Sequence, residues 1–204
     1  MLVPWGASVA AIESAGARVL GCYAEPHRRY HTPEHLGEVL GMLGDLVDLA
    51  PDPVPVELAA WFHDVVYDPR AEPGANEKAS ADSAAVELGA LGVAVPVLAS
   101  VQRLVVMTAS HQVAPGDVDG AVLADADLWI LASPRSRYAR YASDIRAEYG
   151  WLDDERWAEG RSAVLAGFLG RPRIFATDRA HDALDVGARA NLGWELATLL
   201  RAQA

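Results

Sequence analysis

Apolar residues recur three and four positions apart along most of the chain, the spacing typical of amphipathic helices. The segment after Thr32 shows the pattern with its start signal: a hydroxyl residue at the N-cap, Pro33 at the first helical position and Glu34 in the first turn. Its apolar stripe runs from Leu36 to Val47 and stops before Pro51. The same spacing predicts further helices over residues 5–22, 56–67, 76–90, 95–110, 117–132, 135–149, 153–169 and 181–202.

Signals for β-strands are scarce, and Val93-Ala94-Val95 is the one short candidate. Residues 68–75, with two prolines and a glycine, predict a loop. We find no fixed-period repeat and no linker long enough to divide the chain. The pattern therefore predicts a single all-α domain over residues 1–204, a bundle of about eight or nine helices with its core at about 20–202.

Composition and charge narrow the function classes. The chain is 51% hydrophobic and 22% charged, which is typical of a globular protein. It carries 28 acidic against 17 basic residues, a net charge of −11, and its longest basic run is the pair Arg28-Arg29. Such a chain repels a phosphate backbone, so we expect no nucleic-acid polymer as partner.

The cysteine content and the apolar stretches indicate the cellular compartment to expect for the protein. Cys22 is the single cysteine, which excludes an internal disulfide and a cysteine-based zinc cluster. The first residues lack the features of a signal peptide, and the longest apolar stretch, residues 90–101, is too short to span a bilayer. We expect a cytoplasmic protein without a membrane partner, and the sequence leaves open whether it forms a homo-oligomer.

Two apolar segments contain acids that their surroundings do not explain. Asp64 lies in the middle of residues 59–67, which are apolar nearly all the way round, with His63 beside it. Asp125 and Asp127 lie in the similarly apolar residues 122–131. A buried carboxylate costs several kcal/mol unless it is paired or bound to a metal. The alternatives are that Asp64 accepts hydrogen bonds from a neighbouring helix start, and that one of the other two acids caps a loop while the second is exposed.

A third segment, Tyr30 to His35, places two histidines at the predicted start of a helix. His35 falls in the first turn and His31 just outside it. The positive end of the helix dipole disfavours a charged imidazole, so we expect His35 to be neutral and available as a ligand, unless it is an ordinary surface histidine. His35, His63, Asp64 and Asp125 then form a mixed nitrogen and oxygen set that suits Mn, Fe, Co, Ni, Zn or Mg.

In this order, the four residues resemble the H…HD…D signature of the HD-domain metal-dependent phosphohydrolases. The chain is also similar to a bacterial subfamily of predicted HD phosphohydrolases, which reads Y-H-T-x-x-H, W-F-H-D-x-V-Y-D, N-E-x-x-S-A and D-A-D-L-x-I-L. Here these motifs stand at residues 30–35, 61–68, 76–81 and 125–131, and the tail at 171–175 also matches. The resemblance implies an all-α HD bundle that holds a divalent metal ion, and it favours Asp125 over Asp127 as the ligand.

Residues 30–35 also resemble the Y-H-N-x-x-H of cyclic-nucleotide phosphodiesterases, with Thr32 in place of Asn. That resemblance implies His35 as metal ligand and His31 as the general acid. Glu77 is the alternative proton carrier, unless it serves only the dipole of its helix. His111 is a further candidate, as a catalytic group or a second-metal ligand, unless it caps a helix end. Because Asn76-Glu77 stands where some two-metal relatives have His-Glu, we expect one ion.

The function that follows is hydrolysis of a phosphate ester of a small molecule, with a nucleotide as the expected substrate, by metal-activated water. Five arginines are candidate phosphate binders, although each also fits an ordinary surface charge, and Asp127 is a further substrate-binding candidate. A metal- or nucleotide-binding regulatory module without turnover is the alternative. A di-iron oxygenase would need more histidines, because His27 and His181 have no motif around them. The five arginines are Arg28, Arg29, Arg146, Arg171 and Arg173.

Overall fold

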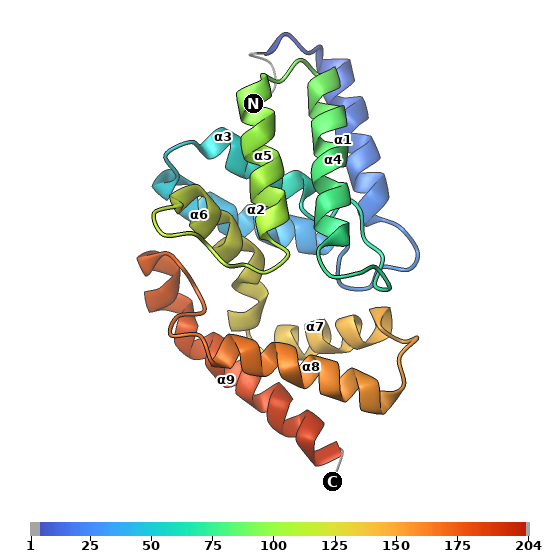
Figure 1. The fold of residues 1–204 in the computed structure, drawn as a ribbon, viewed down its shortest axis with the longest axis vertical. Coiled ribbons are helices and arrows are strands. Elements are labelled where there is room, and N and C mark those ends of the chain that lie inside the picture. Colours follow the sequence, from blue (N-terminus) through green and yellow to red (C-terminus); the bar gives the residue numbers. More distant parts are fainter. Residues whose placement is uncertain (1–4, 203–204) are drawn as a thin grey trace. The chain divides into compact units, whose positions relative to one another are not determined.

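The fold is helical throughout the part of the chain that the computed structural model describes, residues 5–202. These residues form nine α-helices and no β-strand, so the predicted all-α class is confirmed and the strand candidate at 93–95 is wrong. Figure 1 labels the helices in chain order. They are α1 (Val9–Tyr23), α2 (Pro33–Leu46), α3 (Pro53–Phe62), α4 (Ala75–Ala90), α5 (Val95–Met107), α6 (Val118–Asp127), α7 (Arg135–Glu148), α8 (Asp154–Leu169) and α9 (Asp178–Ala202), with 3-10 segments η2 (Val47–Leu49) and η3 (Leu128–Ala132).

Local signals account for the starts of five helices. Ser8 caps α1 by accepting a hydrogen bond from the backbone N–H of Ala11, and Asp153 caps α8 in the same way. Helices α2, α3 and α5 begin with proline at the first or second position. Thr32 does stand at the N-cap of α2, but its hydroxyl makes no capping hydrogen bond.

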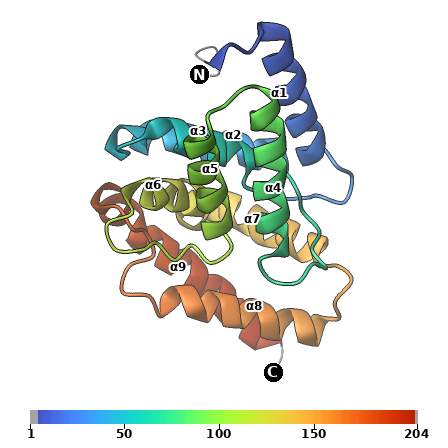
Figure 2. The same ribbon diagram turned by 45° about the horizontal axis from the view of Figure 1, so that its top comes forward.

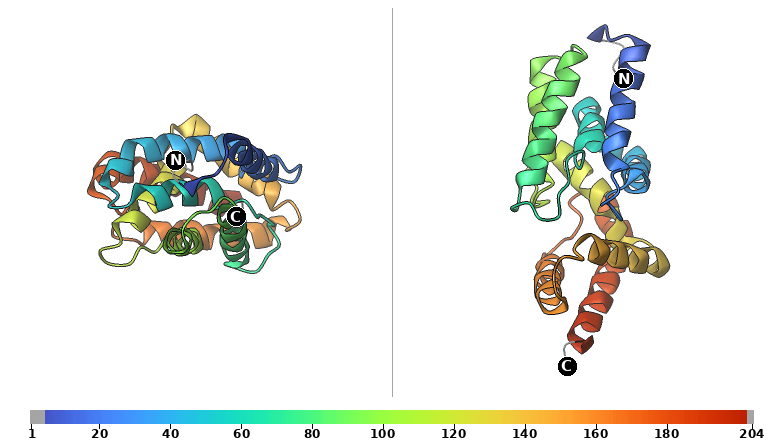
Figure 3. Two further views of the ribbon diagram at one scale, coloured as in Figure 1. Left: turned by 90° about the horizontal axis from the view of Figure 1, so that it is seen from above. Right: turned by 90° about the vertical axis from the view of Figure 1, so that its right-hand side faces the viewer.

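The helices fall into two compact units, the first ending at Asp127 and the second beginning at Leu128. In the first unit α4 and α5 pack as a pair, and the axis of α1 lies nearly parallel to the axes of these two helices (Figures 1 and 3). Helices α2 and α3 cross this group, and α6 packs against both of them (Figure 2). Helix α3 thus contacts α2, α4, α5 and α6, which places its C-terminal end inside the unit.

The second unit is built on α9, which packs against α7, α8 and the 3-10 segment η3. A buried polar group joins its three helices α7, α8 and α9. Glu195 of α9 accepts hydrogen bonds from Arg161 of α8 at 2.8 and 3.0 Å and from the Tyr138 hydroxyl of α7 at 2.6 Å. Asn191 of α9 donates to the backbone carbonyls of Leu131 and Ser133 and so ties η3 to the helix.

Among the described helices, none has the length and apolar character needed to cross a membrane.

Candidate metal centre

The His63-Asp64 pair lies just past the end of α3. The prediction put both residues inside a helix over 56–67, but α3 ends at Phe62 and His63 is its C-cap. The guanidinium of Arg28 donates to the carbonyls of Asp64, at 2.7 Å, and Val65, at 3.0 Å. These two oxygens would bond N–H groups four residues on if the helix continued. The chain therefore leaves the helix here and turns the Asp64 side chain towards α2.

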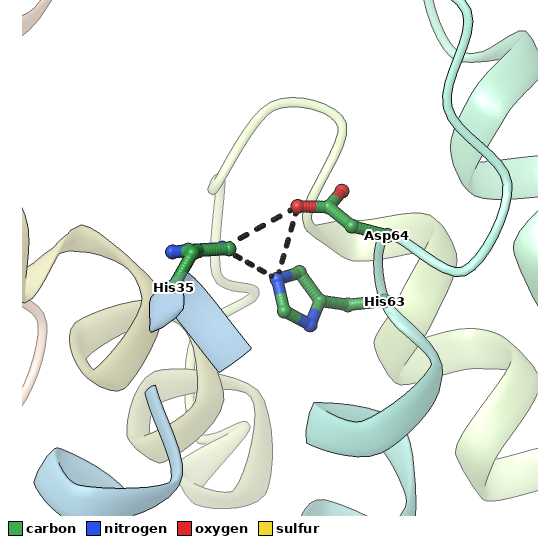
Figure 4. A group of neighbouring side chains, drawn as sticks. All are labelled: His35, His63 and Asp64. Atoms are coloured by element: carbon green, nitrogen blue, oxygen red, sulfur yellow. Dashed lines mark hydrogen bonds and ion pairs between the residues drawn. The ribbon is translucent and has the colours of Figure 1, made fainter. Parts of the chain in front are cut away.

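Three side chains from α2 and the end of α3 converge in the first unit (Figure 4). The Nε2 atoms of His35 and His63 lie 3.0 Å apart. Asp64 Oδ2 lies 3.4 Å from His35 Nε2 and 3.2 Å from His63 Nε2. One ligand atom from each of the three residues lies within 4.8 Å of the other two. The structure thus brings together three of the four predicted metal ligands.

The ring of His63 is held in an orientation that suits a metal ligand. Its Nδ1 lies 2.8 Å from the carbonyl oxygen of Ala60, so Nδ1–H donates to that oxygen. A histidine that ligates metal through Nε2 makes the same kind of bond with its other nitrogen. In neutral His63 the Nε2 lone pair therefore points at His35 and Asp64.

The two histidines of the cluster have pKa values shifted in opposite directions. Burial alone would lower the pKa of His63, but the carboxylates of Asp64 and Asp127 outweigh it and raise the pKa to about 10. Burial lowers the pKa of His35 and so favours its neutral form. Protonated His63 then donates through Nε2 to His35. The two carboxylates make the cluster a place where positive charge is stabilised.

Asp127 faces the two histidines. Asp127 Oδ1 lies 3.4 Å from His35 Nε2 and 3.6 Å from His63 Nε2. Asp125, two residues earlier in α6, is fully buried, and residues two apart in a helix point about 200° apart. The assignment of Asp125 as ligand and of Asp127 as substrate-binding residue stays a prediction, but these contacts with the histidines belong to Asp127. The sequence pattern alone left the two acids equivalent.

His111 supports Asp127 from the loop after α5. Its Nε2 lies 2.8 Å from Asp127 Oδ2, the oxygen that does not face His35 and His63. Together with His63 it holds the pKa of Asp127 down, to about 2, against the effect of burial. The backbone of His111 is left-handed, with φ of 50°, a region that histidine visits more readily than most residues. His111 thus orients a carboxylate of the cluster.

His31 lies at the exposed side of the cluster. Its Nε2 is 3.9 Å from Asp64 Oδ2, and its side chain is 18% exposed, compared with 2% for His35. The ring of Tyr67 packs against it, with the ring centres 4.1 Å apart. The Asp64 side chain is exposed to a similar extent, 15%, so both residues reach the surface of the cluster.

Arg28, a predicted phosphate binder, is a structural residue. Its side chain is fully buried. It donates hydrogen bonds to the carbonyls of His31, Asp64 and Val65 and to the carboxylate of Glu25, with which it also forms an ion pair at 3.0 Å. The residue instead ties the segment before α2 to the end of α3, a role that its sequence neighbours do not reveal.

The other predicted site residues lie outside the cluster. Arg29 is exposed and donates to the carbonyls of Pro26 and Arg28. Glu77 lies in the first turn of α4 and is not among the clustered metal-ligating side chains of the described residues. Arg146 belongs to the second unit, where it pairs with Asp154 at 2.7 Å.

The remaining arginines and histidines also make local contacts. In the second unit, Arg171 lies over the ring of Phe168, and Arg173 pairs with the exposed Asp178. His181 lies 3.3 Å from Asp185. In the first unit, the exposed His27 bonds the carbonyl of Tyr67.

No family model, curated protein or solved structure matches the chain. The resemblance to HD-domain phosphohydrolases therefore remains an expectation from the sequence motifs.

Proposed function

We propose that the first unit binds one divalent metal ion and hydrolyses a phosphate ester of a small molecule, with a nucleotide as the expected substrate. The observation that carries the proposal is the convergence of His35, His63 and Asp64 within 4.8 Å, with Asp127 beside them. The substrate class, a phosphate ester, is taken from the resemblance of the sequence motifs to those of HD-domain phosphohydrolases. The expected cytoplasmic location and the oligomeric state stay predictions.

The donor set fits a first-row divalent ion. Two imidazole nitrogens and two carboxylates, taken from three separate segments, suit Mn, Fe, Co, Ni or Zn, whereas Mg prefers a site made of oxygens. Two of these ligands, His63 and Asp127, are held in orientation by a further hydrogen bond, from His63 to the carbonyl of Ala60 and from His111 to Asp127. We therefore assign Asp127 the ligand role that the family resemblance implied for Asp125, and we favour one ion.

The chain's own residues supply the remaining chemistry. A divalent ion bound here would lower the pKa of a bound water and polarise a phosphoryl oxygen. His31, partly exposed and 3.9 Å from Asp64, is placed to hold a proton and to pass it to the leaving oxygen. The carboxylates of Asp64 and Asp127 hold the metal and also repel a free phosphate, so the ion must offset their charge before substrate binds.

A second function, metal binding without turnover, is favoured by one observation. Of the arginines expected to bind phosphate, Arg28 is buried and bonded to backbone carbonyls and Glu25, Arg29 bonds its own turn, and Arg146 pairs with Asp154. A phosphohydrolase needs positive groups around the transferring phosphoryl group. A regulatory metal-binding module does not.

The experiment is a comparison of metal content and hydrolysis among Asp→Asn variants. Purified protein is loaded with each candidate metal, analysed for stoichiometry and assayed on nucleotides and simple phosphate esters. Asp64→Asn and Asp127→Asn should bind the metal at least tenfold more weakly and lose hydrolysis, while Asp125→Asn, a matched change on the same helix, keeps both. Circular dichroism checks that each variant is folded.

The outcomes separate the functions. Metal binding that depends on Asp64 and Asp127, without hydrolysis of any ester, would support the regulatory module. Full metal content and activity in both variants would refute the site itself. Loss of metal from Asp125→Asn alone would return the ligand role to Asp125.

A further inference from the structure

The first unit contains a cavity that is separate from the metal cluster. It has a volume of about 420 Å³ and lies between α1, the end of α3 and the end of α4. Its walls include the buried side chains of Phe62 and Leu88 and, from α1, Ile12, Ala15, Gly16 and Val19. None of the clustered histidines or aspartates lines it.

The cavity is apolar except at one point on its edge. Among the described residues, every one that lines the cavity apart from Glu13 is apolar or glycine. Glu13 is exposed, as is Val9 at 65% of its surface, so these two residues mark the side open to solvent. Among the described residues the Glu13 carboxylate forms no ion pair, whereas the nearby Arg18 is paired with Glu87 at 2.7 Å. The described part of the entrance therefore carries the negative charge of Glu13.

We propose that this cavity binds a small apolar molecule that carries one cationic amine. The volume lies within the range of small-molecule sites, about 300–1,000 Å³, which are mostly apolar with a few polar groups. The apolar part would replace water in the cavity, and the amine would lie beside Glu13. The net charge of −11 has the same sign as Glu13 and disfavours an apolar anion such as a fatty acid. This inference goes beyond the proposed function and does not depend on it.

Octylamine, 1-octanol and octanoate are suitable probes because they share one chain and differ in charge. Their binding to the full-length protein is measured by isothermal titration calorimetry. Octylamine should bind saturably at one site, about 1.5- to 5-fold more tightly than 1-octanol, the range expected for an exposed ion pair. Octanoate should bind more weakly than either. Glu13→Gln should abolish the difference between octylamine and 1-octanol.

Two glycines of α1 give a matched pair of variants. A Cβ added at Gly16 or at Gly21 meets nothing within 4 Å, and only Gly16 lines the cavity. Gly16→Leu should fill the space and weaken octylamine binding at least tenfold, while Gly21→Leu leaves it unchanged. Both changes also favour helix, so the variants should keep the fold, which circular dichroism checks.

A photoreactive diazirine alkylamine gives a test that needs no variant. After irradiation, labelled peptides should come from α1 and from the end of α3. Label confined to other segments would overturn the proposal. So would absence of saturable octylamine binding, affinity within twofold of wild type in Gly16→Leu, or octanoate binding as tightly as octylamine.

Discussion

Replacing Arg28 by methionine tests the role of its buried guanidinium. The change removes four hydrogen bonds, three of them to the backbone carbonyls of His31, Asp64 and Val65, together with the ion pair with Glu25. A buried acceptor left without a donor costs roughly 1–3 kcal/mol, and water entering the site recovers part of this. Glu25 is 43% exposed and can return to water, so its pair adds little. We expect the free energy of unfolding to fall by about 3–5 kcal/mol.

The assay is urea denaturation followed by tryptophan fluorescence, with metal affinity measured in parallel. Since Arg28 holds the carbonyl of Asp64, metal affinity should fall at least tenfold in the folded variant. Arg28→Lys, whose ammonium has three donors, should recover part of both losses. The neighbouring Arg29→Met is the control and should change stability by under about 1 kcal/mol, because Arg29 is exposed. Stability of Arg28→Met within 1 kcal/mol of wild type, with unchanged metal affinity, would refute the reasoning.

Three further predictions concern both units. His111→Ala should weaken metal binding about 10- to 100-fold by freeing Asp127, as calorimetry would show, and unchanged affinity would contradict its orienting role. Metal-free protein should lose stability as pH rises from about 6.5 to 10, because the folded-state pKa of His63, about 10, lies above its unfolded value. Urea denaturation at pH 6, 8 and 10 measures this loss. The variant His63→Gln should show a weaker dependence of stability on pH. Glu195→Gln should cost about 3–5 kcal/mol because it leaves the charge of Arg161 buried and unpaired, and a thermal midpoint within about 2 °C of wild type would argue against this.

The helices were predictable because their signals are local. Thr32-Pro33-Glu34 and the apolar stripe after it mark α2 without reference to the rest of the chain, and the predicted start agrees with the observed one. The end of α3 was not predictable in this way. It depends on Arg28, which lies 36 residues from Asp64 and acts only once the chain has folded.

The same distinction separates the parts of the candidate site. His35, His63 and Asp64 could be chosen from the sequence because each departs from its local pattern. Asp125 and Asp127 have equally apolar neighbours in α6, so the pattern could not say which one faces the histidines. The contact of Asp127 with His111, sixteen residues away, is a tertiary contact that no local signal reports. That the chain forms a single domain stays a prediction.

The separation of the clustered residues along the chain has a consequence for how the protein would unfold. His35 and His63 are 28 residues apart, and Asp127 follows more than sixty residues later. A cation held by all three would cross-link distant segments of a chain whose one cysteine excludes an internal disulfide. Such a link closes long loops, which limits the freedom of the unfolded chain while the ion stays bound. Removal of the ion would then act as reduction does on a disulfide-bonded protein, speeding the opening of the first unit and exposing it to proteases.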